Sequence, residues 1–309
     1  MKYVIGTLAV IVATLFGFVA ASCGVTTGAE SAGPVPTGAP GGDVAGTGAS
    51  GTGGTLETGS SSTSEGSASL VRYEVWFTRD ESLFMVRRTQ EATPRIGTAA
   101  MESLLGGPST QEQAAAVGSQ IPAGTQLLGL SVDSGVATVD LTSEFESGGG
   151  SAWMNMRIAQ IVYTLTQFPT VKGVLFQLDG QPVDVLGGEG VIVDQPITRK
   201  DYRSLMPAIL VVDPQIGERV DNPVFVQGSA NVFEANVTVE IVDASGKVLR
   251  SAYTTATCGT GCRGTFSIEL TYDVPSDTHG LIVVSDDDAA GTGTSPHEVR
   301  IPVVLTPSS

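Results

Sequence analysis

The sequence has few basic residues for its length. It contains 16 Lys and Arg against 32 Asp and Glu in 309 residues, so its formal net charge at pH 7 is −16. Proteins that hold a phosphate backbone need clustered Lys and Arg, and the negative surface of a lipid leaflet repels acidic proteins. We therefore expect no nucleic-acid partner, and we do not expect lipid headgroups alone to hold the folded part of the chain.

Residues that catalyse reactions or hold metals are also scarce. Zinc takes four ligands, and the only two histidines, His279 and His297, both fall in expected turns. The sequence has no Ser/His/Asp or Cys/His motif, no zinc signature and no nucleotide-binding loop in its proper context. We predict no enzyme, no cofactor and no metal site. A hydrolase that uses two distant carboxylates is the alternative, because its acids need not be adjacent in sequence.

Aromatic residues make up only 6% of the chain. Glycan-binding modules usually expose aromatic side chains, yet both tryptophans, Trp76 and Trp153, fall inside predicted elements. A peptidoglycan- or glycan-binding module is therefore kept as the alternative, since it depends on an analogy of fold alone.

The N-terminus has the features of an export signal. Met1-Lys2 is positively charged, Val4–Ala21 is uncharged and mostly apolar, and small residues precede Cys23. Val19–Cys23 resembles a bacterial lipobox, which predicts a signal peptide over residues 1–22 and a lipid attached to Cys23. The alternative is an uncleaved anchor of about 18 residues, near the lower limit for spanning a bilayer. Both interpretations place the remaining chain at the extracytoplasmic face of the cell membrane.

Residues 23–69 are predicted to form a flexible tether. Of the 46 residues from Gly24 to Ser69, 38 are Gly, Ala, Ser, Thr or Pro, so the segment has little apolar surface to bury. A coil of this length has a root-mean-square span of roughly 35–40 Å and reaches roughly 150 Å when extended. The tether would give reach to an anchored domain, or it is simply a spacer.

Residues 70–200 show the pattern of an α+β domain, with an antiparallel sheet covered by helices on one face. Hairpins are expected around Asp80–Ser82 and Asp133–Gly135. A helix should run from Thr93-Pro94 to Leu105. A second helix is predicted over Ser151–Phe168 by apolar residues at the 3.6-residue period.

Three features of this region could hold a ligand. Gly106-Gly107-Pro108 could bring backbone amides close to a bound group, but a helix stop is favoured. Gly148-Gly149-Gly150 lacks the context of a phosphate loop. Asp140 and Glu144 could form a carboxylate pair, but helix capping or solvation is favoured because no His or metal cluster is near in sequence.

Residues 206–307 contain only short predicted strands. Seven apolar runs are separated by Gly, Pro, Asn and Asp, which predicts an antiparallel, all-β immunoglobulin-like sandwich. Val237, Val239 and Ile241 should face its core. Phe233 is expected in the core or between domains rather than on the surface.

Two sequence features of the sandwich could be functional. Cys258 and Cys262 flank a Gly-rich turn, and outside the cytoplasm such a pair is expected to form a disulfide, with free thiols or a metal as alternatives. Asp286-Asp287-Asp288 lacks the spacing of a calcium loop and is expected to be a solvated acidic turn.

Several motifs of the first region together resemble the GerMN (sporulation and spore germination) domain. They follow the order of that family over nearly the whole region: Leu104–Pro108, Ile121–Thr125, Gly135–Leu141, Ala159–Thr166 and Phe176–Gly180. The second region resembles the immunoglobulin-like domain of bacterial spore germination proteins, which commonly follows GerMN. The segments that carry this likeness are Asn222–Val224, Gly228–Val237, Asp243–Gly246, Gly264–Phe266 and Ile301–Val303.

These resemblances imply a role in sporulation, germination or envelope assembly, with a fold similar to modules that build protein rings. The leading hypothesis is a non-catalytic lipoprotein, anchored to the membrane through its lipid, that acts as an interaction or scaffold module in the cell envelope. Its expected partners are envelope proteins or further copies of itself, and peptidoglycan is the alternative partner.

Overall fold

The computed structural model describes residues 69–286 and 297–308. The expected signal peptide, Cys23, the tether up to residue 68, Asp287 and Asp288 lie outside the described residues. Residues 64–309 form one compact unit. No helix in the described ranges is long and apolar enough to cross a membrane.

The first region starts with a long hairpin of β1 (Leu70–Arg79) and β2 (Ser82–Glu91). Asp80 and Glu81 turn the chain with positive φ values of 48° and 60°, the conformation of a two-residue hairpin turn. Val75 lies opposite Val86 and Phe77 opposite Phe84. The predicted hairpin is therefore present.

Three α-helices follow the hairpin in chain order. They are α1 (Ile96–Leu105), α2 (Thr110–Ala114) and α3 (Ser151–Leu165). Helix α1 begins two residues later than predicted, because Pro94 and Arg95 form a turn before it. The short helix α2 was not predicted. Its capping box, in which Ser109 and Glu112 bond each other's backbone amides, could have been recognised from the sequence.

A mixed sheet completes the first region. Its order is β3-β4-β5-β6, built from β3 (Leu127–Asp133), β4 (Val136–Leu141), β5 (Gly173–Leu178) and β6 (Gln181–Pro182). The α+β class is confirmed, but β4 and β5 pair in parallel, whereas an antiparallel sheet was expected. The reason is that α3 connects them as a crossover helix, which returns the chain in the same direction.

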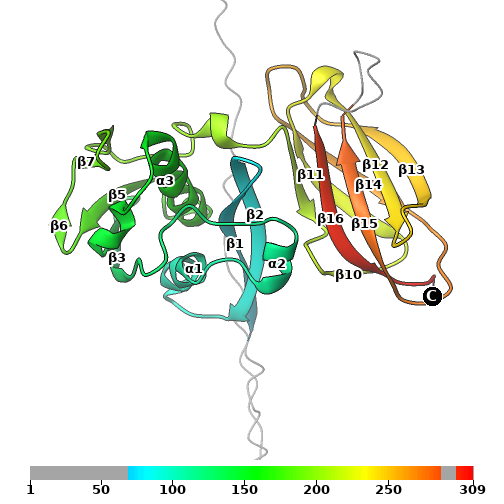
Figure 1. The fold of residues 1–309 in the computed structure, drawn as a ribbon, viewed down its shortest axis with the longest axis horizontal. Coiled ribbons are helices and arrows are strands. Elements are labelled where there is room, and N and C mark those ends of the chain that lie inside the picture. The colour runs from blue at the N-terminus through cyan, green and yellow to red at the C-terminus, as the bar shows by residue number, and fades with distance from the viewer. Residues whose placement is uncertain (1–68, 287–296, 309) are drawn as a thin grey trace, which may run out of the picture. The chain divides into compact units, whose positions relative to one another are not determined.

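Helices α1 and α3 lie between the hairpin and this sheet. Both helices contact β1, while α1 also contacts β3 and α3 contacts β5 (Figure 1). Helix α3 is consequently buried over most of its circumference from Met154 to Leu165. After the small hairpin of β7 (Val185–Leu186) and β8 (Val191–Ile192), the chain reaches a 3₁₀ turn, η2 (Arg203–Leu205).

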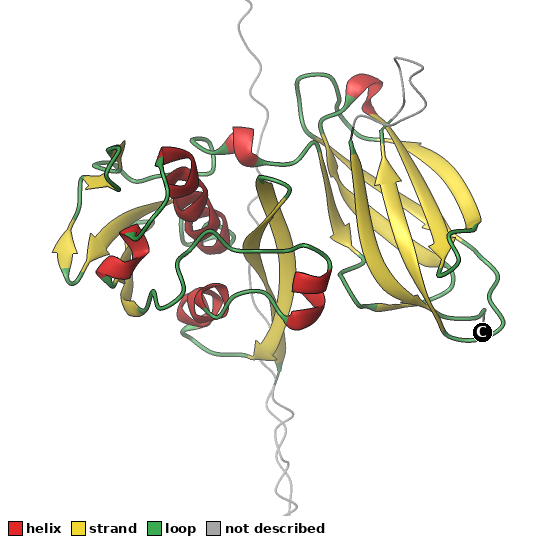
Figure 2. Cartoon of the chain, in the orientation of Figure 1, coloured by secondary structure: helices red, strands yellow, loops and turns green. Residues whose placement is uncertain are grey.

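The second region is a sandwich of two sheets (Figure 2). One has the order β14-β11-β9 and the other β10-β16-β15-β12-β13. The strands are β9 (Ile209–Asp213), β10 (Arg219–Val220), β11 (Val224–Ala230), β12 (Asn236–Asp243), β13 (Val248–Thr255), β14 (Gly264–Leu270), β15 (Thr278–Ser285) and β16 (Glu298–Leu305). Each of the seven predicted runs is a strand, and the all-β class is confirmed.

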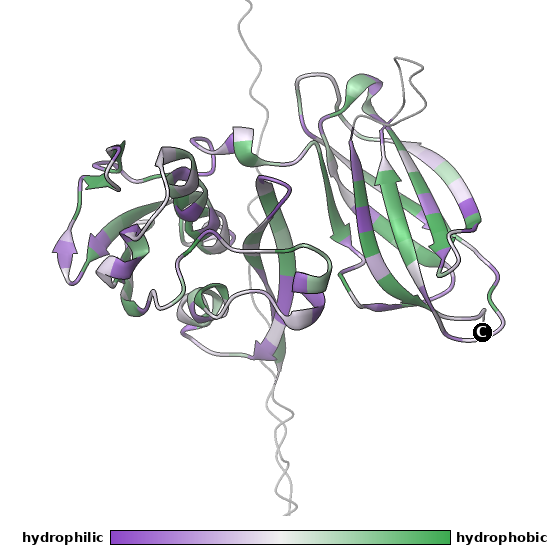
Figure 3. Cartoon of the chain, viewed as in Figure 1, coloured by the Kyte–Doolittle hydropathy of each residue, from purple (hydrophilic) through white to green (hydrophobic). Residues whose placement is uncertain are grey.

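The alternation of the sandwich strands places their apolar residues inside. Val237, Val239 and Ile241 are fully buried, as predicted. Figure 3 shows apolar residues along the central strand β15, whereas the edge strand β13 contains both apolar and polar residues. The η3 turn (Phe233–Ala235) precedes β12.

The two regions meet where β2 contacts β9. Arg87 forms an ion pair with Asp213, and its backbone amide donates to the side chain of Gln215 at 3.0 Å. Arg79 donates to the carbonyl of Arg300 at 3.2 Å. The buried residues of both regions belong to one contiguous cluster.

Candidate functional site

Of the two carboxylates singled out in the first region, Asp140 holds backbone and Glu144 is exposed to solvent, as expected. Asp140 accepts a hydrogen bond from the amide of Gly180 at 3.0 Å and so closes the turn between β5 and β6. Glu144 lies on the 3₁₀ turn η1 (Ser143–Glu146). Asp140 therefore stabilises a β-turn, which differs from both helix capping and simple solvation.

The glycine-rich segments are likewise used by the fold. The amides of Gly106 and Gly107 donate to the carbonyls of Glu102 and Leu104, and Gly107 has φ of +79°, so this segment ends helix α1. The Gly148–Gly150 loop leads into α3, whose first amide, that of Ser151, donates to Glu189 at 2.7 Å. The anionic group at this helix terminus is therefore the chain's own carboxylate.

Arg157 fixes the same loop from inside. Its guanidinium donates to four carbonyls, those of Gln120, Phe145, Ser147 and Gly148, at 2.7–2.9 Å. Burial lowers the pKa of Arg157, because desolvation disfavours its charged form. No sequence pattern could have identified this residue, because a single Arg in a helix belongs to no motif or period.

Two aromatic residues differ from expectation. Trp153 has a side chain 57% exposed, although its position in a helix suggested burial. It lies one residue away from the apolar stripe of α3 that begins at Met154, so the helix points it outward. Phe233 is 54% exposed instead of packed in the core or between domains, because it lies on the η3 turn, where Glu234 reverses the chain with φ of +52°.

Asp286 also differs from expectation, because it is buried rather than solvated. It accepts from the amide of His297 at 2.9 Å, and its second carboxylate oxygen lies 2.7 Å from Nδ1 of that histidine. This pair joins the end of β15 to the residue before β16. Within residues 69–286 and 297–308, no group of three or more His, Cys, Asp or Glu could hold a metal ion.

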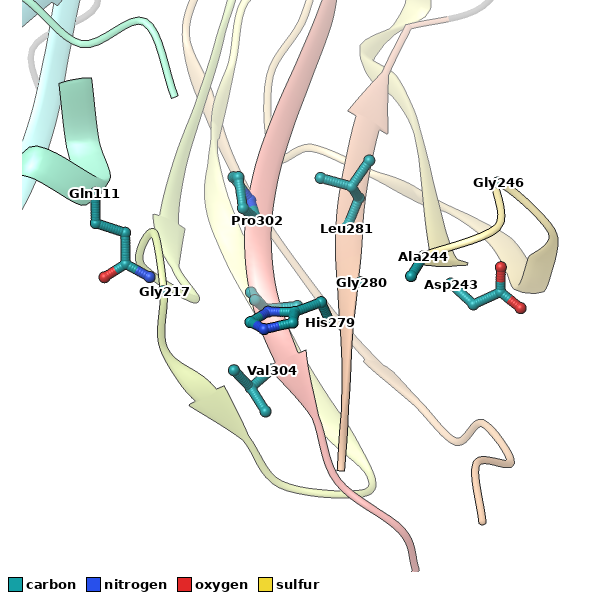
Figure 4. Close-up of a pocket in the computed structure, with 11 residues that line it drawn as sticks. Gln111, Gly217, Asp243, Ala244, Gly246, His279, Gly280, Leu281, Pro302 and Val304 are labelled. Carbon is teal, nitrogen blue, oxygen red and sulfur yellow. The ribbon is translucent and has the colours of Figure 1, made fainter. Parts of the chain in front are cut away.

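A shallow pocket of about 330 Å³ lies where Gln111 of α2 reaches toward Gly217 (Figure 4). His279, Leu281, Pro302 and Val304 from β15 and β16 line it. Asp243 lies at its far side, but its carboxylate is bonded to the amides of Ser245 and Lys247. The pocket therefore lacks a free charged group that could direct a ligand.

A different groove, of about 890 Å³, is lined by three arginines. We call it the arginine groove. Arg199, Arg203 and Arg263 face it, and none of its ten lining residues is acidic; the other seven are Tyr163, Ser204, Met206, Ala208, Asn231, Gly261 and Cys262. Three of the chain's 16 basic residues thus gather in one place on a protein with a net charge of −16.

Arg199 is held against helix α3. It donates to the carbonyl of Tyr163 at 2.7 Å and to the hydroxyl of Thr166 at 2.8 Å. Its guanidinium lies 4.8 Å from the centre of the Tyr163 ring and 5.5 Å from that of Trp76. Its carboxylate neighbour, Glu74, is 3.7 Å away. These contacts fix the cation on one side of the groove.

Arg263 is held on the sandwich side. It donates to the carbonyl of Ser229 at 3.2 Å, to the hydroxyl of Ser229 at 3.1 Å and to the carbonyl of Pro207. Arg203, the first residue of η2, is exposed and forms no side-chain hydrogen bond or ion pair with any residue that the structure describes. The three arginines thus come from two segments, since Arg199 and Arg203 lie four residues apart and Arg263 lies on the sandwich side.

The cysteine pair forms part of the groove wall. The structure pairs Cys258 with Cys262, with Cα atoms 5.8 Å apart. The loop between them is tied to the sandwich, because Thr260 donates to the carbonyl of Val232 at 2.9 Å and Gly261 to the side chain of Asn231 at 3.0 Å. The bond itself stays a prediction for the exported protein.

Electrostatics link the three arginines to the buried tyrosine. Burial raises the pKa of the Tyr163 hydroxyl, while the charges of Arg199, Arg263 and Arg203 oppose that rise because cations favour the phenolate. Burial lowers the pKa of Arg199 and of Arg263, but arginine stays protonated at any physiological pH. The groove therefore carries three full positive charges.

Two protein-family models match the chain. The one described as sporulation and spore germination covers residues 65–184. The one described as the immunoglobulin-like domain of bacterial spore germination covers residues 208–292. Both resemblances inferred from the sequence are confirmed, and neither description names a catalytic activity.

Solved structures similar to the chain include a proposed lipoprotein from Clostridium perfringens, at 22% identity and a TM-score of 0.33, covering 44% of this chain and 93% of that one. The first GerMN domain of the sporulation protein GerM from Bacillus subtilis is 22% identical with a TM-score of 0.36, covering 42% and 99%. The tandem GerMN domains of GerM are 13% identical with a TM-score of 0.39, covering 77% and 61%. No curated protein sequence matches the chain.

Proposed function

Since the chain carries a sporulation and spore germination domain followed by the immunoglobulin-like domain of bacterial spore germination, we propose that it is a membrane-anchored binding module of the cell envelope. It acts by position: a lipid on Cys23 holds it at the membrane, the tether sets its reach, and the folded regions engage a partner outside the cytoplasm.

The arginine groove is the observation that carries this proposal. A binding site needs an open surface with unsatisfied charge, and the groove provides one. The candidate carboxylate pair argues the other way, because Asp140 is bonded to a turn amide and Glu144 is exposed on a 3₁₀ turn. General acid–base chemistry needs a carboxylate free to reach a substrate. Binding is therefore favoured over catalysis.

The anchor can be tested separately from the binding. In cells that receive a radiolabelled fatty acid, the full-length chain should take up label and fractionate with membranes. Cys23→Ala should lose the label and accumulate as the unprocessed form. Label that persists in Cys23→Ala, or membrane fractionation without any label, would contradict the lipid anchor. Cys258→Ala serves as the control, since it also removes one cysteine but leaves the lipobox intact.

Partner engagement can be tested by cross-linking in intact envelopes. A photo-reactive residue in place of Ser204, which lines the groove, should capture a discrete envelope component. The same residue in place of Glu102, an exposed position on α1 away from the groove, is the matched control. Equal capture from both positions, or none from either, would count against a binding role for the groove.

A glycan-binding function is the second candidate, and Trp153 favours it. Its exposed indole lines a groove of about 280 Å³ together with Gln120, Met156 and Leu205. Exposed aromatic rings can stack on sugars through apolar contact, with neighbouring polar groups fixing orientation. Saturable pelleting of the protein with purified peptidoglycan at physiological salt, lost in Trp153→Ala but kept in Tyr253→Ala, would support this function. Tyr253, the control, is an exposed aromatic residue on β13.

A further inference from the structure

We propose that the arginine groove is a binding site for a phosphate group carried by a larger envelope molecule. This deepens the proposed function by naming the chemical class of the ligand. The proposed extracytoplasmic location determines only which molecules can supply the phosphate. The affinity of the groove for phosphate is a property of the folded protein alone.

Local charge sets the groove apart from the rest of the molecule. The net charge of −16 suggests that the protein avoids anions, and this expectation holds for its surface as an average. Ionic strength limits the reach of surface charges to about 8–10 Å, so a ligand inside the groove responds mainly to the groove's own lining. That lining has three guanidinium groups and no carboxylate, and Glu74, 3.7 Å from Arg199 outside the lining, offsets part of one of the three charges. An anion is therefore attracted locally even though the whole protein is acidic.

The arrangement of the three arginines favours phosphate over carboxylate. A carboxylate has two oxygens in one plane, which a single guanidinium can satisfy in a bidentate pair. Arg199 and Arg203 lie four residues apart on the segment that leads into η2, and Arg263 directly precedes β14. Three cations that line one groove from two segments suit a tetrahedral phosphate, which offers more than two oxygens, better than a planar carboxylate. The hydroxyl of Ser204 and the amide of Asn231 add neutral polar groups to the same lining.

The structural bonds of these arginines do not use up their donors. A guanidinium has five N–H groups. Arg199 donates to Tyr163 and Thr166 and pairs with Glu74, and Arg263 donates to Ser229 and Pro207, so each is positioned while part of its guanidinium stays available. Arg203 spends none on the described residues. Two fixed cations and one adaptable cation make a preorganised site, which costs less ordering on binding than three loose side chains.

The size of the groove indicates that the phosphate belongs to a larger ligand. A volume of about 890 Å³ exceeds what one phosphate ion needs. Phosphodiester groups occur both in anionic envelope polymers and in phospholipid headgroups, and the groove recognises what these share. The two sources are separated by the choice of probe.

Binding can be measured with the full-length chain in a neutral detergent, using a fluorescent oligomer of glycerol phosphate as the probe. We expect saturable binding that weakens as salt is raised, since charge–charge contacts are screened. Arg203→Glu should weaken it by about tenfold or more, because it replaces a charge-assisted contact by repulsion. Arg203 has no described structural bond, so this variant should unfold at the same denaturant concentration as the unmodified protein. Arg250→Glu, which makes the same charge change at an exposed position on β13 outside the groove, should bind as the unmodified protein does.

Three further probes separate the outcomes. Inorganic phosphate should compete for the groove, and an oligomer of glutamate of similar charge should bind more weakly. Nanodiscs with phosphatidylglycerol, compared with neutral ones, identify a lipid headgroup as the source if they compete better than the oligomer. No binding by the unmodified protein, equal loss in Arg203→Glu and Arg250→Glu, or glutamate binding as strong as phosphate binding would overturn the proposal. Loss of the anchor in Cys23→Ala leaves these measurements unaffected, so the two proposals can fail independently.

Discussion

The two folded regions bury polar groups to different extents. The first region buries Thr78, Glu112, Thr125, Arg157, Gln160 and Thr164, whereas the described part of the sandwich buries only Ser285, Asp286 and Thr306. The three in the sandwich lie at strand ends. Those in the first region, Thr125 apart, lie within strands or helices. In the first region, buried polar side chains therefore supply hydrogen bonds to backbone groups that no neighbouring strand satisfies.

Helix α3 shows how this replacement works. The hydroxyl of Thr164 accepts from the amide of Trp76 at 3.0 Å, and the amide group of Gln160 donates to the carbonyl of Trp76 at 3.1 Å. Gln160 also accepts from the amide of Gln120 at 2.9 Å. These bonds link the hairpin and a loop to a helix that has no free backbone donors of its own in its middle. In the sandwich, hydrogen bonds between neighbouring strands satisfy the buried backbone groups instead.

The largest loss of stability is expected for Arg157→Met, which tests the role of buried polar groups in the first region. Methionine keeps the length of the side chain but removes every donor, so the carbonyls of Phe145, Ser147 and Gly148 lose a partner, and that of Phe145 loses it in a buried place. We expect the free energy of unfolding to fall by about 3–5 kcal/mol in urea titrations followed by circular dichroism.

Two variants sharpen that result. Arg157→Lys keeps the charge but cannot span four carbonyls, and it should recover only part of the loss. Ile241→Val, in the sandwich core, should cost about 0.5–1.5 kcal/mol, since it removes only one methylene. A loss below about 1 kcal/mol in Arg157→Met would break the comparison, because it would mean that the loop does not depend on its polar support.

A smaller effect is expected from Glu112→Gln, with a dependence on pH. Burial alone would raise the pKa of Glu112, but its bonds to Arg88 at 2.6 and 2.8 Å and to the amide of Ser109 outweigh burial and lower it. A lowered folded pKa means that the stabilisation is fully present above the unfolded value of about 4.3 and is lost as the pH falls below it.

We expect Glu112→Gln to lower the free energy of unfolding by about 1–2 kcal/mol at pH 7, and by less at pH 3. The exposed Glu102 of the preceding helix provides the control, and Glu102→Gln should change stability little at either pH. The same loss for Glu112→Gln at both pH values would show that packing of the side chain matters rather than its charge.

The features that repeat along the chain could be predicted from sequence. The alternation of Val237, Val239 and Ile241 and the helical period of α3 both arise from local geometry that one element imposes on its own residues. The parallel pairing of β4 with β5 needs the path of a whole crossover, which no single element encodes. Burial of Asp286 could not be predicted either, because its partner His297 is separated from it by ten residues.

The arginine groove could not be predicted from local sequence patterns. Its cations occupy positions 199, 203 and 263, and the tyrosine beneath them is residue 163. No period or motif connects these positions, and the average charge of the chain argues against a cationic site. Only the contact between the two regions brings Arg263 beside Arg199. Trp153 is different, since its place beside the apolar stripe of α3 could have predicted its exposure.

An effect as small as that of Glu112→Gln is expected at the disulfide loop of the sandwich, which takes no part in strand pairing. The Cys258–Cys262 loop lies between β13 and β14 and pairs with neither sheet. A disulfide would stabilise this loop, as buried polar groups stabilise the first region. A disulfide around so short a loop removes little chain entropy, and the double variant Cys258→Ser, Cys262→Ser should lower the free energy of unfolding by about 1–2 kcal/mol. With Cys23 lipidated, the denatured mature protein should titrate no thiol without reductant and two after reduction. Two thiols without reductant would show an open loop, and the hydrogen bonds of Thr260 and Gly261 would then have to hold this wall of the groove alone.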